Sequence, residues 1–431
     1  MIQRFLRRRF HGVQQPLGRW ILRHVAEFVF LSPMIVPAWI WLRVGKREVR
    51  VVGKGSSVIS MFLAPLEPEL RRRSVLPGSL KRLIVLNLSV DANSQLRKMY
   101  DEIVTIYGSE QKFRRRIVWW ASQVGIPRKD LWESQSDPIW VTGLPSVRLT
   151  PEEIVRGEAF LEQIGIDKHR SFICYTVRSE SYYLKRIEEG VILKPRSVRN
   201  PSEVVYLQVA AEMCRNGVPV IRMGKDLDTS ISEEIYPGVI DYAKKYRSDF
   251  LDIFLLSRCK FIFSGGSGIV WFRWLFNLPA VFCDNFDIRR TQMNQDLTIF
   301  QKVWLSRENR FASISEMLKM SSEYSDERHQ ERLGVKLVRN TFEEISTVCD
   351  EMNARIDGLW KTTADDEILQ HRYHALVAKY SDLPNQQGGG RIQLRDFCEP
   401  RLRLLCVMTQ NRARTQVDRR RGSRYSRLLR Y

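Results

Sequence analysis

The sequence predicts an α/β protein with two domains, each built on a parallel β-sheet, and a helical C-terminal extension. Short apolar runs rich in strand-forming residues alternate with amphipathic runs of helical period, which is the pattern of doubly wound parallel sheets. One segment, Lys260 to Asn285, contains a complete strand–turn–helix–strand unit. With 431 residues the chain is long enough for two or three domains and a large core.

The first 45 residues form a basic, apolar leader. Four arginines occur before residue 10, and an apolar stretch from Val25 to Leu42 follows. No small-residue cleavage site comes after this stretch, so a secretory signal peptide fits poorly. Pro33 and Pro37 interrupt a span of barely minimal length, which weakens a transmembrane helix. We favour a segment that lies on an anionic membrane surface, and a buried helical hairpin broken at the prolines is an equal alternative.

Residues 46–165 are predicted to form the first α/β domain. Lys81 to Leu88 has the composition of a strand, and Asn93 to Gly108 has the apolar periodicity of a helix. A second helix is expected from Arg115 to Val124, and residues 137–145 are expected to form a loop and a strand.

A strong helix start marks the boundary between the two domains. Thr150 suits the N-cap, Pro151 suits the first helical position, and Glu153 completes a capping box. We expect this helix to run to Gln163 and to stop at Gly165, and we place the boundary there.

Residues 166–350 are predicted to form the second α/β domain, followed by a helical extension over 351–400 and an arginine-rich tail over 401–431 that we expect to be disordered. The predicted strands are 172–177, 218–222, 239–240, 261–263 and 280–283, and the predicted helices are 202–216, 249–257 and 267–276.

The positive charge is concentrated at the two ends of the chain. The formal net charge is +20, with +8 in residues 1–50 and +9 in residues 401–431, so residues 51–400 carry the remaining +3. This nearly neutral body has no interleaved basic and aromatic residues, and we expect no specific nucleic-acid partner. The seven cysteines are widely spaced without a C-x-x-C pair, which favours a reducing compartment.

Glycine and serine residues fill the turn inside the Lys260–Asn285 unit. The turn consists of Ser264, Gly265, Gly266, Ser267 and Gly268. Glycines let backbone N–H groups approach a ligand closely, and these groups together with the helix dipole favour an anion. The pattern suits the diphosphate of a nucleotide-activated donor, and a tight turn whose glycines only satisfy packing is an equal alternative.

Polar residues also follow the other strands of the second domain, at the edge where open α/β sheets bind ligands. Six separate segments are expected to converge there. Besides the 264–268 turn, they contain Arg178, Ser179, Glu180, Ser181, Tyr182, Arg199, Asn200, Arg222, Gly224, Asp241, Tyr242, Ser248, Asp249 and Asp252.

These polar residues allow a structural and a functional interpretation. In the first, Arg178 and Arg222 form ion pairs with Asp241 or Asp252, and Ser248-Asp249 is an N-cap with an acidic first turn. In the second, guanidinium groups bind phosphate oxygens bidentately and offset the charge on a departing nucleoside diphosphate.

The order of these motifs resembles a family of bacterial proteins classed as glycosyltransferases of surface-carbohydrate loci. The resemblance covers about residues 80–320, and residues 199–285 are its most specific block. More distantly, a strand ending in Arg and a later Ser-Gly turn are similar to the donor half of fucosyltransferase-like enzymes with two Rossmann-like domains, the GT-B type. The matching residues are Asn93, Leu96, Thr150, Glu153, Leu161 to Gly165, Cys174 to Tyr182, Arg199-Asn200, Val220 to Gly224, Asp241 to Ala243, Ser248 to Asp252, Cys259 to Phe261, Ser267-Gly268, Pro279 and Asn285.

The resemblance implies two Rossmann-like domains facing a cleft, and a metal-independent, hexosyltransferase-type enzyme at the cytoplasmic face of the cell membrane. It would move a sugar from a nucleotide sugar to a glycan or lipid-linked acceptor, with the acceptor on the first domain. We expect no cofactor and no metal, because arginines and amides carry the charge and no Asp-x-Asp pair suits a metal.

The resemblance also implies roles for individual residues. Arg178 and Arg222 would hold the diphosphate, and Glu180 would be the base for the acceptor hydroxyl. The donor-binding residues would be Arg199, Asn200, Gly224, Asp241, Tyr242, Ser248, Asp249, Asp252, Ser264, Gly265, Gly266, Ser267, Gly268 and Asn285.

One departure from the family pattern supports a rival hypothesis. The family typically has His and Asp flanking the strand-end Arg, whereas this chain has Thr176 and Ser179. If those positions supply an acid/base pair, either Glu180 replaces them or the chain is a non-catalytic scaffold in a polysaccharide assembly complex.

Overall fold

A computed structural model describes most of the chain, namely residues 17–53, 58–76, 78–131, 139–179, 181, 184, 187–188, 200–225, 227, 230–288, 295–320, 327–380 and 391–392. The predictions for residues 1–16 of the leader, for Glu180, Tyr182 and Arg199, and for the 401–431 tail lie outside these residues.

The first domain is built on a four-stranded parallel sheet with the order β3-β2-β1-β4. Its strands are β1 (Glu48–Val52), β2 (Leu83–Asn87), β3 (Thr105–Tyr107) and β4 (Arg128–Leu131). Its helices are α2 (Leu17–Val44), α3 (Ile59–Ser74), η1 (Leu80–Arg82), α4 (Ser94–Asp101), α5 (Lys112–Ala121), α6 (Ile139–Thr142) and α7 (Pro151–Gln163).

Alternation along the strands sends side chains to both faces of this sheet. Val51 and Leu86 pack in a cluster with Leu42 of α2 and Val118 of α5, so these two helices cover one face. Val85 packs with residues of α3 and α4 on the other face. Both faces are therefore covered, as parallel sheets require.

The second domain is built on a seven-stranded sheet, also parallel throughout, with the order β14-β10-β9-β8-β5-β6-β7. Its strands are β5 (Ile173–Val177), β6 (Val220–Met223), β7 (Val239–Ile240), β8 (Ile262–Gly265), β9 (Ala280–Asn285), β10 (Leu297–Phe300) and β14 (Arg391–Ile392). The helices of this domain are α9 (Glu203–Arg215), α10 (Tyr242–Lys245), α11 (Asp249–Arg258), η3 (Gly268–Phe276) and α14 (Phe342–Ile356).

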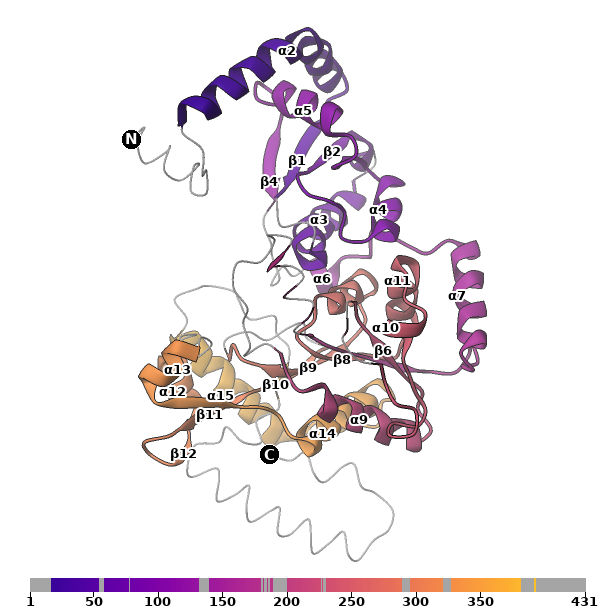
Figure 1. Ribbon diagram of the computed structural model, residues 1–431, viewed down its shortest axis with the longest axis vertical. Helices are drawn as coiled ribbons and strands as arrows, with labels where there is room; N and C mark the ends of the chain where they lie inside the picture. Colours follow the sequence, from indigo (N-terminus) through magenta and orange to yellow (C-terminus); the bar gives the residue numbers. More distant parts are fainter. Residues whose placement is uncertain are drawn as a thin grey trace, which may run out of the picture.

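A small antiparallel sheet extends this domain. It contains β11 (Lys302–Leu305), β12 (Arg310–Phe311) and β13 (Val335–Val338), and it lies beside α12 (Ile314–Lys319), α13 (Glu327–Leu333) and α15 (Ala364–Tyr380) (Figure 1). The two large parallel sheets, one above the other in Figure 1, confirm the predicted α/β fold with two Rossmann-like domains.

Most predicted elements are confirmed, with five corrections. The helix expected to reach Gly108 ends at Asp101, and the β-forming run Thr105–Tyr107 pairs with β2 instead. Residues 139–142 are helical rather than a strand. The boundary expected at residue 350 falls inside α14, whose Ile345 and Val348 pack in the core of the second domain. The 351–400 extension is not purely helical, because β14 joins the large sheet.

The fifth correction concerns the apolar run after the glycine turn, which forms a 3₁₀-helix instead of an α-helix. Side chains three residues apart eclipse in a 3₁₀-helix. Trp271 and Trp274 have this spacing, and their ring centroids are 4.0 Å apart. The helix ends where Asn277 adopts the left-handed conformation with φ 53°.

The leader helix α2 is continuous through Pro33 and Pro37, so the hairpin alternative is wrong. Within the described part of the chain, His24–Val44 is one segment that is long and apolar enough to cross a membrane by length and composition.

A buried arginine joins the two domains. Arg71 of α3 is paired with Glu67 at 2.8 Å, and both side chains are inaccessible to solvent. The same guanidinium donates to the Trp274 carbonyl and, at 3.0 Å, to Asn277 Oδ1 at the end of η3. Because an unpaired buried charge is costly, this contact holds α3 against η3.

Candidate functional site

A cavity of about 240 Å³ lies between the two domains. Its lining comes from the segments that follow β1 and β2 in the first domain and β5, β6 and β8 in the second, together with Arg247 and Asp252 near the start of α11. The lining residues are Val58, Ile59, Ser60, Ala92, Val177, Arg178, Ser179, Gly224, Lys225, Leu227, Arg247, Asp252, Gly266, Ser267, Gly268, Ile269 and Trp271.

The strand order explains why the cavity is located there. In the second sheet the chain proceeds from β5 to β6 and β7 on one side, then crosses to β8, β9 and β10 on the other. In the first sheet β1 lies between β2 and β4 in the same way. Open α/β sheets bind ligands outside the carboxyl ends of the strands at such a reversal. The cavity therefore lies where both sheets favour a ligand.

The glycine turn after β8 is shaped by close packing and by the backbone. A Cβ on Gly265 would lie 2.5 Å from Pro201 Cγ, and Gly266 has a φ of +85°. Ser264 Oγ accepts from the N–H groups of Gly266 and Ser267, at 3.1 and 3.3 Å. The amides that remain for an anion are therefore those of the first turn of η3, from Gly268 onward, which have no acceptor within their helix.

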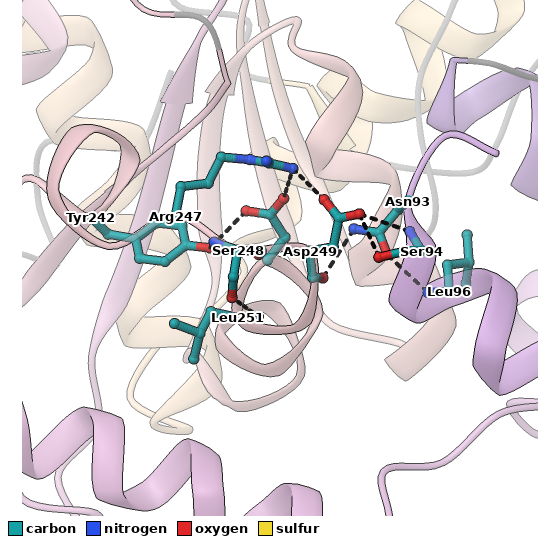
Figure 2. Close-up of polar contacts among 9 residues, drawn as sticks. Asn93, Ser94, Leu96, Tyr242, Arg247, Ser248, Asp249 and Leu251 are labelled. Atoms are coloured by element: carbon teal, nitrogen blue, oxygen red, sulfur yellow. Dashed lines mark hydrogen bonds and ion pairs between the residues drawn. The ribbon is translucent and has the colours of Figure 1, made fainter. Parts of the chain in front are cut away.

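Arg247 connects the cavity with the start of α11 (Figure 2). Its Nη2 lies 2.7 Å from Asp249 Oδ1 and 2.8 Å from Asp252 Oδ2. Its Nε is buried and has no hydrogen-bond partner within the described structure. Burial acts to lower the pKa of Arg247, but the two aspartates outweigh it and raise the pKa, so this cation is permanent.

The carboxyl group of Asp252 has a raised pKa. It is 2% exposed and accepts from Tyr242 Oη at 2.9 Å as well as from Arg247. Burial raises its pKa to about 6, and Arg247 only partly opposes that effect. Asp252 therefore changes charge close to neutral pH.

Asp249 bridges the domains at the rim of this network. Its Oδ2 accepts from the N–H and the Oγ of Ser94, both at 2.8 Å, and its carbonyl accepts from Asn93 Nδ2 at 3.0 Å (Figure 2). Burial acts to raise its pKa, but the bonds from Ser94 and Arg247 outweigh it and lower the pKa. The contact places an ionised carboxylate at the N-terminus of α4, where the helix dipole favours it.

The structure brings part of the predicted site together. Arg178, Gly224, Asp252, Gly266, Ser267 and Gly268 all line the cavity, as does Ser179 beside them. Arg178 and the glycine turn thus leave the ends of the neighbouring parallel strands β5 and β8 and line one space.

Arg222 is not brought to the cavity lining. It is 1% exposed, and its guanidinium is bound by Glu203 Oε2 at 2.6 Å and by Asp241 Oδ1 at 3.1 Å. Burial acts to lower its pKa, and Glu203 outweighs that effect, so the pKa is raised. The arrangement is the ion pair of the structural interpretation, and it corrects the expected diphosphate role of Arg222.

Several other predicted donor-binding residues also have structural contacts outside the cavity lining. Asp241 accepts from Arg222 and from the Ile231 N–H, and Ser248 caps α11 by accepting from the Leu251 N–H. Tyr242 Oη bonds to Asp252, and Asn285 Oδ1 accepts from the Asp287 N–H.

Asn200 lies near the glycine turn without lining the cavity. The following residue, Pro201, is the neighbour that a side chain at Gly265 would strike. Asn200 Oδ1 is buried and lacks a hydrogen-bond partner within the described residues. Glu180 and Arg199 lie outside the described residues, so their predicted roles stay predictions.

Sequence reasoning missed two cations and the whole first-domain wall. Arg247 and Lys225 line the cavity, and so do Trp271, Val58 to Ser60 and Ala92. Lys225 directly follows Gly224, and Arg247 directly precedes the predicted Ser248 cap, so each was adjacent to a recognised motif. Val58 to Ser60 directly follow the polar, glycine-rich run Gly53 to Ser57 after β1, which the sequence reasoning did not single out.

The arrangement is suited to a small anion. Arg178, Lys225 and Arg247 supply three cationic groups, and Asp252 supplies a carboxylate whose charge depends on pH. Among the described residues no group of three or more His, Cys, Asp or Glu side chains gathers in a way that could hold a metal ion.

Comparisons with known proteins give a distant likeness only. No family model matches the chain, and no curated protein matches it. Among solved structures it is similar to Escherichia coli ADP-heptose LPS heptosyltransferase II, with 12% identity and a TM-score of 0.37 over 55% of this chain and 84% of that one. A family 9 glycosyl transferase from Veillonella parvula has 11% identity and a TM-score of 0.35 over 55% and 81%. These values are too low to support an argument, so the fold assignment depends on the sheet topology described above.

Proposed function

We propose that this protein is a glycosyltransferase that binds the diphosphate of a nucleotide sugar in the interdomain cavity and transfers the sugar to a glycan or lipid-linked acceptor. One observation carries the proposal. Arg178 after β5, Lys225 after β6, Arg247 before α11 and the start of η3 after β8 all line one cavity, opposite a second parallel sheet. The departure of a nucleoside diphosphate is stabilised by positive groups that are already in position before the reaction, and these second-domain residues supply such groups.

Each cationic group has a role in this proposal. Arg178 and Lys225 contact the diphosphate directly, and the N–H groups of the first turn of η3 bind a phosphate oxygen. Arg247 shares its charge between Asp249 and Asp252, so it acts at longer range or after Asp252 takes up a proton. These groups offset the developing charge without a metal ion, and a hexosyl donor is the class that we propose.

Activation of the acceptor hydroxyl requires a base near the sugar. Asp252 is the carboxylate among the described lining residues, and its pKa of about 6 suits proton transfer near neutral pH. Glu180, which follows Arg178 and Ser179 in the chain, is the second candidate from the sequence.

The direct test is a thermal-shift and calorimetric screen of nucleoside diphosphates and nucleotide sugars against the full chain. A ligand that binds only the folded protein raises its melting temperature by mass action. We expect Arg178→Ala to weaken the binding about 10- to 100-fold, which corresponds to about 1.4 to 2.8 kcal/mol.

Arg258→Ala is the matched control, because Arg258 lies at the far end of α11 and pairs with Glu158 at 3.5 Å outside the cavity. Equal losses in the two variants, or no nucleotide that binds, would contradict the proposal. Activity that survives EDTA would support the metal-independent form.

A non-catalytic binding protein is the second candidate. The sequence observation that favours it is the presence of Thr176 and Ser179 where the resembling family has His and Asp. Thr176 is fully buried, and its hydroxyl has no hydrogen-bond partner in the described structure. Tight nucleotide-sugar binding without hydrolysis or transfer would favour this function over the enzyme.

A further inference from the structure

The proposed function leaves the outer face of helix α2 without a role. The inner face of α2 is easily recognised, because half-buried or buried side chains recur three or four residues apart from Glu27 through Leu31, Ile35 and Ala38 to Leu42. Leu31 is 3% exposed, and Leu42 belongs to the core cluster on the first sheet. This stripe runs along the helix from residue 27 to residue 42.

The outer face is apolar as well. Val29, Phe30 and Val36 are 64%, 75% and 61% exposed, and Val25 and Ile40 are also exposed on α2. The covering helix of an ordinary α/β domain presents polar side chains to water. A contiguous exposed apolar face of this length marks a site of interaction with another molecule or with a membrane.

The contacts of α2 with the protein fix its orientation. The helix is 28 residues long, about 42 Å, and forms one end of the molecule in Figure 1. Glu27 is paired with Arg116 of α5 near its start. Near its end, Trp39 Nε1 donates to the Val124 carbonyl at 2.9 Å and Arg43 Nη1 donates to the Gly125 carbonyl at 2.8 Å.

These contacts decide between spanning a bilayer and lying on it. A spanning helix needs apolar surroundings through about 30 Å of hydrocarbon. Here one side of α2 is attached along its length to α5, which carries Arg114, Arg115 and Arg116. Insertion of α2 across a membrane would pull these arginines into the hydrocarbon, whereas an orientation in the membrane plane leaves them at the surface.

The charges near the outer face of α2 indicate which kind of lipid surface it would bind. Glu27 is the acidic residue of the Leu17–Val44 segment, and Arg116 neutralises it. Exposed basic residues accompany this helix, namely Arg43 in its last turn, Lys46 just after it, and Lys112 and Arg114 on the adjoining α5. An apolar face bordered by cations and interfacial aromatic residues such as Trp41 is suited to anionic lipids.

We propose that the outer face of α2 binds an anionic lipid bilayer, with the helix lying in the plane of the membrane and the first domain seated on the surface. The proposal does not depend on the identity of the ligand in the cavity. It predicts a monotopic protein whose N-terminus stays on the same side of the membrane as its two domains.

Vesicle flotation with the full chain tests the proposal. We expect the protein to float with sealed vesicles of phosphatidylcholine and phosphatidylglycerol, and to float weakly with phosphatidylcholine alone. Val29→Glu combined with Val36→Glu should lower the bound fraction on the order of tenfold or more, because both charges enter the lipid-facing side. The matched control is Val155→Glu with Ile368→Glu, which adds the same charge at exposed apolar positions of α7 and α15.

Further measurements make each outcome decisive. Circular dichroism and melting temperature should be unchanged in both variants, because all four positions are exposed. An epitope tag at the N-terminus should remain cleavable by protease added outside the vesicles. Protection of the tag would show a spanning helix and overturn the proposal. Absence of vesicle binding would overturn it as well. A dimer in light scattering that the Val29→Glu and Val36→Glu variant dissociates would also overturn it, and would assign the face to a second copy of the chain.

Discussion

The two walls of the interdomain cavity differ in the charge of their described lining residues. The wall from the second domain carries Arg178, Lys225, Arg247 and the glycine turn. The described lining of the first domain, Val58 to Ser60 and Ala92, contains no charged side chain. Both walls stand at the carboxyl ends of parallel strands, and among the described lining residues the cations are all on the second-domain wall. The difference favours an anion against the second-domain wall, and in the proposed function the first-domain wall faces the acceptor.

The largest expected effect comes from separating the two walls. Arg71→Ala removes the buried cation that joins α3 to η3 and leaves Glu67 charged in the interior. We expect a loss of about 3 to 5 kcal/mol in the free energy of unfolding, measured by denaturant titration. Arg72→Ala, at the exposed neighbouring position, should cost less than about 0.5 kcal/mol. Similar values for the two variants would mean that the walls are held together by other contacts.

Next in size is the removal of one cation from the charged wall. Arg247→Ala should weaken nucleotide-sugar binding about 10-fold, and Arg247→Lys should restore part of it, because charge counts here more than geometry. Isothermal titration at pH 5 and at pH 7.5 checks this expectation. If Arg247→Ala binds the ligand as tightly as wild type at both pH values, Arg247 serves only to organise Asp249 and Asp252.

The third prediction concerns the pH dependence of the charged wall. The folded protein holds the proton of Asp252 with a pKa of about 6, against 3.8 for an ordinary aspartate. The folded state therefore binds more protons between these values, and stability falls as pH rises from about 4 to about 6. Asp252→Asn should flatten this decline by about 2 kcal/mol in urea titrations across that range.

A control separates this effect from other buried carboxylates. Burial also raises the pKa of Asp350 to about 6, but Asp350 lies on α14 and does not line the cavity. Asp350→Asn should flatten the stability curve too. In the wild type we expect nucleotide-sugar affinity to rise below pH 6, because the neutral Asp252 no longer offsets the charge of Arg247. Only Asp252→Asn should remove this rise. A rise that persists in Asp252→Asn would exclude Asp252 as the titrating group.

The last prediction tests the first-domain wall. Ala92→Leu fills part of the first-domain side while every cation stays in place. Transfer to acceptor should fall about tenfold, and nucleotide-sugar affinity should change less than about twofold. A large loss of nucleotide affinity would show that the donor contacts this wall and would end the division of roles.

The fold was largely predictable from local patterns. The capping box at Thr150 forms as expected, and β5 to β9 lie within a few residues of their predicted bounds, whereas β10 and β14 were not predicted. The misses have tertiary causes. Thr105–Tyr107 forms a strand instead of helix because it pairs with the edge of β2. Helix α2 continues through Pro33 and Pro37 because its packing against α5 stabilises it.

The candidate site was only partly predictable. A glycine turn after a strand is a local feature, and Gly266, Ser267 and Gly268 of this turn line the cavity. Sequence reasoning singled out Arg222, which ends a predicted strand, and not Arg247, which precedes the predicted Ser248 cap. Arg222 is buried against Glu203 and Asp241, each 19 residues away, whereas Arg247 reaches the cavity.

By itself the sequence determined the alternation of strands and helices, the start of α7, the glycine turn and the concentration of charge at the chain ends. These depend on side-chain periodicity and backbone freedom, which act over a few residues. The tertiary structure alone decided which arginines are paired and which face the cavity, that Asp249 would join Ser94 across the domains, and that α2 would keep an apolar face outside. Those outcomes depend on which groups, far apart in the sequence, come close together in the low-dielectric interior. No local sequence pattern specifies these spatial contacts.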